Sequence, residues 1–257
     1  MDIRGASISL ISDKECQSVK NIVSDVDDTI TYKGALLPLS LSALYKLKEN
    51  NKRIILVTGG SAGWADIYIR QWPVDYVITE SGALLLKKNS RGDVDYITNP
   101  VIDKERVQIN RNKLLDATKK YKLSSDQYAR IYDIAYDKSF LEEDDLTILK
   151  DLCRSMGANF AESSIHLNVW FGDYDKALGL KSFLPYMTDD DLHSFIDSSV
   201  YLGDSFNDQI MFSLFPLSIG MHGIDDNKDK YDVLPRYITE GYGGYGFLEA
   251  VNKLTDI

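Results

Sequence analysis

The chain has 257 residues, 44% hydrophobic and 26% charged, a composition typical of a folded globular protein with room for more than one domain. Asp and Glu total 39 against 29 Lys and Arg, and the resulting net charge of −10 makes nucleic acid an unexpected partner. No apolar run reaches the ~18 residues of a membrane span, and the charged N-terminus does not fit a signal peptide, so we expect a soluble, cytoplasmic protein without a membrane partner.

The two cysteines give a weak indication of the compartment. Cys16 and Cys153 lie far apart in the sequence and lack the Cys-x-x-Cys spacing of a metal or redox site. This usage fits reduced thiols in a cytosolic protein, although a single disulfide between them stays possible.

The first part of the chain alternates between strand and helix patterns. Short runs rich in Val and Ile predict strands at residues 21–24, 53–57 and 74–78. Residues 39–50 place leucines and a tyrosine on one stripe and predict a helix. Such alternation is typical of βαβ units and therefore of a parallel sheet.

The middle of the chain has a different pattern. Alternating polarity over residues 165–169 is typical of a half-buried antiparallel strand. The elements expected in this part are a polar stretch at 87–95, helices at 104–121 and 142–156, and strands at 130–135, 159–162 and 165–171. We therefore expect an α+β cap domain at residues 86–174, inserted into a core formed by residues 1–85 and 175–257.

The last part returns to the core pattern, with strands expected at residues 200–202 and 217–219. The glycines of residues 241–246 match the Gly-x-Gly-x-x-Gly pattern, but too few residues follow for a second strand, so we expect a turn before the last helix. The predicted fold class is α/β, with a doubly wound Rossmann-like parallel sheet as the core and an inserted α+β cap domain.

Clustered acids follow two of the predicted core strands. Asp25-Val26-Asp27-Asp28-Thr29 follows the strand at 21–24, and Gly203-Asp204-Ser205-Phe206-Asn207-Asp208 follows the strand at 200–202. In an open α/β sheet, ligands collect beyond the carboxyl ends of the strands. Crowded carboxylates need a shared proton or a cation, and an all-oxygen donor set favours Mg²⁺ over zinc. A calcium loop starting at Asp25 is a poor alternative, because it needs Gly at Ile30 and Glu at Leu36.

Two further segments carry groups suited to an anion. Thr58-Gly59-Gly60 follows the strand at 53–57, and it offers a hydroxyl beside glycine amides that can approach an anion closely. Lys176 opens a helical segment after the inserted unit, where an ammonium can hold a phosphate oxygen. Magnesium, the Thr58 hydroxyl and Lys176 could together receive the charge of a phosphoryl group.

These four motifs, in this order, resemble those of the haloacid dehalogenase superfamily of phosphohydrolases. The long separation of Thr58 from Lys176 leaves room for a cap, as in the type IIB subgroup of Cof-like and sugar-phosphate phosphatases. The segment Thr79-Glu80-Ser81-Gly82-Ala83 is similar to the Glu-Asn-Gly-Ala turn of that subgroup, with Ser81 in place of Asn. Gly60 stands where many relatives have Arg, so one cationic contact to the substrate is expected to be missing.

The resemblance implies a role for each matching residue. Asp25 would be the nucleophile, and Asp27 would be the general acid and base. The phosphate-binding residues implied are Thr58, Gly59, Lys176 and Asn207. The implied Mg²⁺ ligands are Asp25, the backbone carbonyl of Asp27, and Asp204, with Asp208 either joining through water or orienting Lys176.

The function expected from this resemblance is Mg²⁺-dependent hydrolysis of a phosphomonoester through an aspartyl-phosphate. The expected substrate is a small phosphorylated sugar or polyol. Two alternatives stay open, namely a phosphosugar mutase and a sugar-phosphate-binding protein without activity. The sequence does not indicate the oligomeric state.

Overall fold

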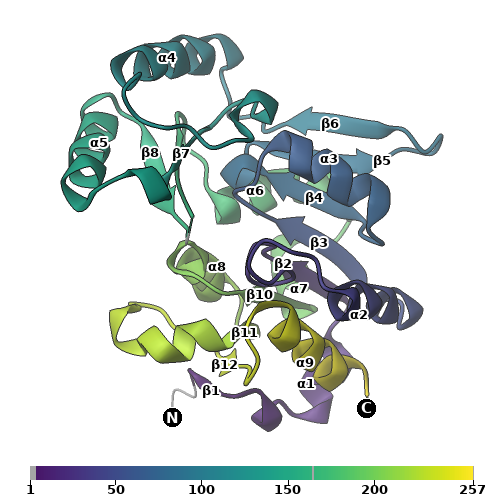
Figure 1. Cartoon of the computed structure of the whole chain (residues 1–257). Helices are drawn as coiled ribbons and strands as arrows, with labels where there is room; N and C mark the ends of the chain where they lie inside the picture. The colour runs from purple at the N-terminus through teal and green to yellow at the C-terminus, as the bar shows by residue number, and fades with distance from the viewer. Residues whose placement is uncertain (1–3, 164, 257) are drawn as a thin grey trace.

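The computed structural model describes residues 4–163 and 165–256, and most of its strands belong to one large sheet (Figure 1). Within the described residues, nine strands follow the order β1-β12-β11-β10-β2-β3-β4-β5-β6. Their bounds are β1 (Ala6–Ser7), β2 (Asn21–Ser24), β3 (Arg53–Val57), β4 (Tyr76–Thr79), β5 (Leu84–Lys88), β6 (Val94–Thr98), β10 (Ser199–Gly203), β11 (Ser218–Gly220) and β12 (Tyr237–Ile238). All neighbours from β1 to β4 in this order are parallel, whereas β5 and β6 are antiparallel additions.

Helices cover both faces of this sheet. The α-helices are α1 (Asp13–Ser18), α2 (Pro38–Glu49), α3 (Ala62–Gln71), α4 (Lys104–Ala117), α5 (Glu143–Ser155), α6 (Lys176–Phe183), α7 (Leu192–Asp197), α8 (Gln209–Leu214) and α9 (Gly243–Thr255). One apolar cluster joins α1, α2, α3 and α9 to one face, and a second joins α6, α7 and α8 to the other. The predicted α/β class is thereby confirmed.

Short 3-10 helices connect these elements. They are η1 (Ile8–Leu10), η2 (Glu80–Gly82), η3 (Gln127–Ala129), η4 (Lys138–Phe140), η5 (Leu184–Tyr186), η6 (Phe206–Asp208) and η7 (His222–Lys230). Of the glycines in residues 241–246, which were expected to form a turn before the last helix, Gly241 alone precedes α9, whereas Gly243, Gly244 and Gly246 lie in its first residues.

The course of the chain puts the switch point of the sheet beside β2. From β2 the chain moves outward through β3 and β4, and it later returns to β10 on the other side of β2 before moving outward through β11 and β12. Adjacent loops therefore leave in opposite directions at the carboxyl ends of β2 and β10. In doubly wound folds, this crevice is where ligands bind.

A second, smaller sheet belongs to residues 104–170, which we call the small unit. Its antiparallel strands β7 (Ile134–Asp137), β9 (His166–Trp170) and β8 (Asn159–Glu162) lie in that order, with α4 and α5 beside them (Figure 1). The main apolar cluster continues from the large sheet into this unit through Leu114, Leu149 and Leu167. The small unit is therefore packed on the core through shared apolar contacts.

The hairpin of β5 and β6 belongs to the large sheet. Residues 94–98 lie inside the segment predicted as the cap, yet β6 pairs with β5 along its whole length. A strand was not expected within residues 87–95 because Lys, Asn, Arg and Asp dominate there. The domain boundaries at 86 and 174 stay a prediction.

The described residues also bear on membrane-spanning helices and on the cysteines. Within residues 4–163 and 165–256, no helix combines the length and the apolar character needed to cross a bilayer. Cys16 and Cys153 are buried and free.

Candidate active site

The predicted site residues of the core lie at one edge of the large sheet. Asp25 follows β2, Thr58 follows β3, Asp204 follows β10, and Lys176 opens α6. The pairing of β2 with β10 continues past the strand end, since the Asp25 backbone N–H donates to the Leu202 carbonyl oxygen at 2.9 Å. The parallel pairing of β2 with β10 thus brings together the acidic loops that follow these strands, although Asp25 and Asp204 are almost 180 residues apart in the sequence.

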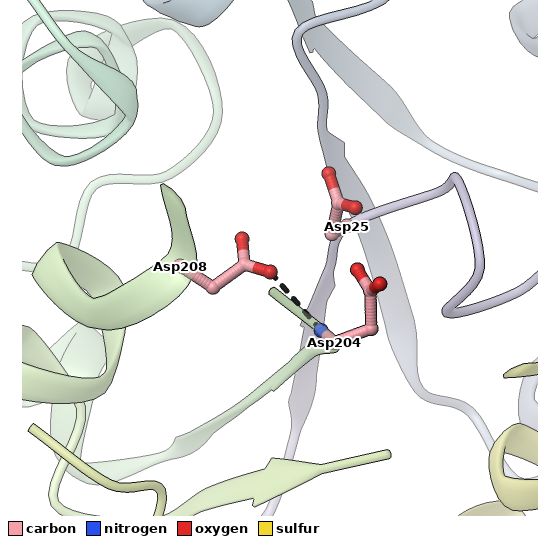
Figure 2. Close-up of side chains that lie close together, drawn as sticks. All are labelled: Asp25, Asp204 and Asp208. Carbon is pink, nitrogen blue, oxygen red and sulfur yellow. Dashed lines mark hydrogen bonds between the residues drawn. The ribbon is translucent and has the colours of Figure 1, made fainter. Parts of the chain in front are cut away.

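Three carboxylates converge at this edge. One oxygen each from Asp25, Asp204 and Asp208 lies within 4.8 Å of the others, and Figure 2 shows the three side chains around a common space. Asp25 and Asp208 are buried, and Asp204 is partly buried. The Lys176 ammonium lies against the same group, with Nζ 2.8 Å from Asp25 Oδ1 and 2.7 Å from Asp208 Oδ1.

Asp208 is held by donors on both of its oxygens. Its Oδ1 accepts from Lys176 and from the Tyr201 hydroxyl at 2.6 Å. Its Oδ2 accepts from the backbone N–H groups of Asp204 and Ser205 at 3.0 and 3.1 Å, and Figure 2 draws the first of these bonds. Because donors occupy both oxygens of this carboxylate, its contacts support orientation of Lys176 over direct ligation of a metal.

The electrostatics of the cluster fit a divalent cation. Burial, opposed by the Lys176 ammonium, raises the pKa of Asp25 to about 7, and burial with the Asp208 and Asp25 carboxylates raises the pKa of Asp204 well above its usual range. Burial alone would lower the pKa of Lys176, but the carboxylates of Asp208 and Asp25 raise it, so this side chain is an ammonium. One ammonium does not balance three crowded carboxylates. The all-oxygen donor set is the one that Mg²⁺ prefers.

Asp27 is partly buried and lines the cleft. Burial and the nearby Asp28 carboxylate raise its pKa. A carboxyl group with a raised pKa keeps its proton closer to neutral pH, which suits a general acid.

The Thr58 loop is tied down by its own hydrogen bonds. Thr58 Oγ1 accepts from the Gly60 backbone N–H at 2.9 Å, and the Gly60 carbonyl accepts from the Thr79 hydroxyl at 2.6 Å. Asn207 lies on the other side of the site, where its Oδ1 accepts from Lys176 at 3.1 Å. An ammonium has three donors, and Asp25, Asp208 and Asn207 engage all three, so a phosphoryl oxygen would have to displace one acceptor.

A cleft of about 940 Å³ opens above this edge of the sheet, between the core and the small unit. It is lined by six of the eight predicted site residues, namely Asp25, Asp27, Gly59, Lys176, Asp204 and Asn207. The buried side chains of Thr58 and Asp208 lie behind this lining. The structure therefore brings the four motifs together at one cavity.

The small unit contributes cleft residues that the sequence did not single out. Asp126, Arg130, His166 and Asn168 all line the cavity. His166 and Asn168 share one face of the alternating strand, a polar face that the period-two pattern assigns to solvent, whereas the structure turns it toward the cleft. Of these four residues, Asn168 alone had a sequence feature that could have pointed to it, because Asn is uncommon in strands.

Glu80 is a further residue whose role the sequence did not reveal. Its buried carboxylate accepts from the Ala62 N–H at 3.1 Å in the core. It also accepts from backbone N–H groups of residues 131–133 in the small unit, at 2.7 Å from Tyr132. One buried carboxylate thereby joins the two parts of the protein beside the cleft.

Two kinds of sequence comparison were informative in different ways. Residues 22–133 match the family model of haloacid dehalogenase-like hydrolases. No curated protein matches the chain in sequence.

Solved structures share the fold over nearly the whole chain. A Thermoplasma acidophilum protein has a TM-score of 0.70 at 16% identity, covering 93% of this chain and 99% of its own. A phosphatase of the haloalkanoate (HAD) enzyme superfamily from Bacteroides thetaiotaomicron has a TM-score of 0.63 at 17% identity, covering 98% and 100%. The C-terminal domain of the Candida albicans trehalose-6-phosphate phosphatase has a TM-score of 0.68 at 11% identity, covering 99% and 98%. Over residues 22–133 the chain is therefore similar to haloacid dehalogenase-like hydrolases, and the solved structures extend the likeness of fold to nearly the whole chain.

Proposed function

We propose that this protein is a haloacid dehalogenase-like hydrolase, namely a Mg²⁺-dependent phosphatase that forms an aspartyl-phosphate on Asp25. The observation that carries the proposal is the convergence of Asp25, Lys176 and Asp204 at one cavity edge, with Asp27 facing the same cavity. Two proteins that share the fold are themselves phosphatases. A protein that only binds a sugar phosphate would not need a proton donor such as Asp27, so the presence of Asp27 beside Asp25 favours an enzyme.

In the first step, an Asp25 carboxylate oxygen attacks phosphorus, and the bond from phosphorus to the substrate oxygen breaks. Asp27 donates its proton to that leaving oxygen, so the product departs as an alcohol. In the second step, Asp27 removes a proton from a water molecule whose oxygen attacks phosphorus. The phosphorus bond to Asp25 then breaks, inorganic phosphate leaves, and both carboxyl groups return to their initial states.

The charge on the phosphoryl oxygens would be received from several sides. The Lys176 ammonium and the Thr58 hydroxyl supply donors, and Gly59 and Asn207 complete the anion site. Mg²⁺ bound by Asp25, the Asp27 carbonyl and Asp204 would neutralise part of that charge. Asp208 holds Lys176 in place through its 2.7 Å contact.

The substrate that we favour is a small phosphorylated sugar or polyol in the cytoplasm. The cleft wall formed by the small unit carries polar groups, among them Asp126, His166 and Asn168, which can bind hydroxyl groups. One of the proteins with the same fold is a trehalose-6-phosphate phosphatase. We propose that the small unit is the cap that selects the leaving group and excludes bulk water.

The test is release of inorganic phosphate from a panel of sugar and polyol phosphates, with Mg²⁺ and with EDTA. We expect turnover with Mg²⁺, loss of turnover with EDTA, and no turnover in Asp25→Asn. The control Asp189→Asn, at an exposed position, should keep wild-type activity. Phosphate returned to a second sugar hydroxyl would indicate a mutase. The proposal is wrong if the intact protein releases no phosphate, or if Asp25→Asn releases it at the wild-type rate.

A further inference from the structure

The Gly59 carbonyl oxygen is held by two side chains of the small unit. Asn168 Nδ2 donates to it at 2.6 Å, and an Arg130 guanidinium nitrogen donates to it at 3.0 Å. A Cβ at position 59 would lie 3.0 Å from Asn168 Nδ2, tighter than ordinary contacts, so glycine suits this approach. Both donors are buried and both lie beside the cleft.

The peptide group between Gly59 and Gly60 also contacts the Thr58 side chain, through its N–H. The Gly59 carbonyl and the Gly60 N–H belong to one planar peptide and point in opposite directions. The Gly60 N–H donates to Thr58 Oγ1 at 2.9 Å. A hydroxyl oxygen that accepts this bond has its own proton left to donate, and the direction of that proton depends on the orientation of the peptide.

The two donors are themselves fixed from the small unit. The fully buried Asp133 carboxylate accepts from Arg130 at 2.8 Å and from Asn168 at 3.4 Å, while Asp126 accepts from Arg130 at 3.1 Å. Glu80 holds the backbone of Tyr132 and Asp133 against the core. The donors therefore have little freedom to leave the Gly59 carbonyl without moving the small unit.

We propose that Asn168, assisted by Arg130, is a positioning residue for phosphoryl binding: by holding the Gly59 carbonyl, it orients the Gly59–Gly60 peptide and thereby the hydroxyl proton of Thr58. This inference rests on the proposed phosphatase function. If it holds, the phosphoryl-binding site is complete only when the small unit is packed on the core. The small unit acts through the Gly59–Gly60 peptide and does not itself contact the phosphoryl oxygens.

The experiment compares Asn168→Ala with Asn99→Ala in the Mg²⁺-loaded protein. Asn99 is an equally buried amide that donates to a glycine carbonyl, that of Gly82 at 2.9 Å, but it lies outside the cleft lining. The readouts are kcat and KM for a turned-over monoester, inorganic phosphate affinity by calorimetry, and the thermal midpoint. Asn168→Ser serves as the second variant if the alanine variant does not fold.

We expect Asn168→Ala to weaken phosphate binding and to lower kcat/KM by about tenfold each, the effect of one lost hydrogen bond to a charged group. Asn99→Ala should lower the thermal midpoint by about as much as Asn168→Ala does. It should keep the phosphate affinity and kcat/KM within about twofold of wild type. In a Thr58→Val background the Asn168 effect should disappear, because Asn168 acts through the Thr58 hydroxyl.

Two results would contradict the positioning role of Asn168 and leave the proposed phosphatase function standing. One is wild-type phosphate affinity and turnover in Asn168→Ala or Asn168→Ser. The other is an Asn168 effect that is undiminished in the Thr58→Val background. A wild-type protein without phosphatase turnover would instead contradict the proposed function itself.

Discussion

Among the acids of the cleft, Asp27 has the environment that suits proton transfer. It is only partly buried, burial and Asp28 raise its pKa, and it lines the cavity, whereas Asp25 and Asp208 are held by the Lys176 ammonium. A general acid matters most when the leaving group is a poor one. An alkoxide from a sugar needs the proton, while p-nitrophenolate leaves readily without it.

This difference gives a prediction for Asp27→Asn. We expect kcat for a sugar phosphate to fall about 10²- to 10⁴-fold, because the alkoxide then departs without a proton. The loss in the phosphorylation step should be smaller for p-nitrophenyl phosphate, as measured by the nitrophenolate burst in single-turnover kinetics. Equal losses for the two substrates in that step would rule out Asp27 as the general acid. Asp189→Asn, at an exposed position, is the control and should leave both substrates unaffected.

At the scale of elements, the short helix α1 is tied to the large sheet through Glu15. Helix α1 begins with a capping box in which Ser12 and Glu15 bond each other's backbone. Glu15 also pairs at 2.8 Å with Arg236, which directly precedes β12. Although burial alone would raise the pKa of Glu15, the Ser12 hydrogen bonds and the Arg236 charge lower it.

A lowered pKa in the folded state makes this contribution pH-dependent. Ionised Glu15 stabilises the fold above the pKa of the unfolded chain, and that stabilisation is lost as the pH falls through the lower folded value. We therefore expect Glu15→Gln to cost about 1 kcal/mol at pH 7 and much less near pH 3, measured by urea unfolding. Glu105→Gln, at an exposed position in the first turn of α4, is the control. A cost independent of pH would contradict the prediction.

Close packing of two elements joins the small unit to the core beside the Thr58 loop. A Cβ at Gly63 in α3 would lie 2.6 Å from the Ala129 Cβ in η3. Helix propensity alone would favour alanine at Gly63 by about 1 kcal/mol. The clash opposes this gain, since overpacking costs ~1–3 kcal/mol.

We expect Gly63→Ala to push η3 away, with a net loss of stability of about 1 kcal/mol and weaker phosphate binding. Ala129→Gly removes the opposing methyl group, so the double variant should recover both properties. Calorimetric phosphate titrations and urea unfolding of the two variants give the comparison. If Gly63→Ala alone is more stable than wild type, the close approach of η3 to α3 is not a constraint.

Across the whole molecule, the crowded acids make folding sensitive to a cation. Asp25, Asp204 and Asp208 are brought within 4.8 Å only in the folded chain, so a cation held by Asp25 and Asp204 binds the native state selectively. We expect Mg²⁺ to raise the thermal midpoint, with a stabilisation of about 2.7 kcal/mol at a hundred times its dissociation constant. The shift should vanish in Asp204→Asn and persist in Asp189→Asn. An equal shift in both variants would mean that Mg²⁺ acts elsewhere.

Local patterns were sufficient to predict the core strands and the polar residues that follow them. The strands predicted at 21–24 and 53–57 coincide with β2 and β3, because buried parallel strands are continuous runs of β-branched and aliphatic residues. The acids and the Thr58 loop follow these strands directly. Their meeting at one sheet edge follows from the parallel topology, so motif order alone anticipated the site.

Only the tertiary structure decided what surrounds that site. The β5–β6 hairpin pairs on an otherwise parallel sheet despite its polar sequence, and Glu80 binds backbone amides more than 50 residues away. Asn168 reaches the Gly59 carbonyl across 109 residues of sequence. Periodicity assigns a side chain to one face of its own strand, whereas the partner opposite that face is set by how the small unit packs on the core.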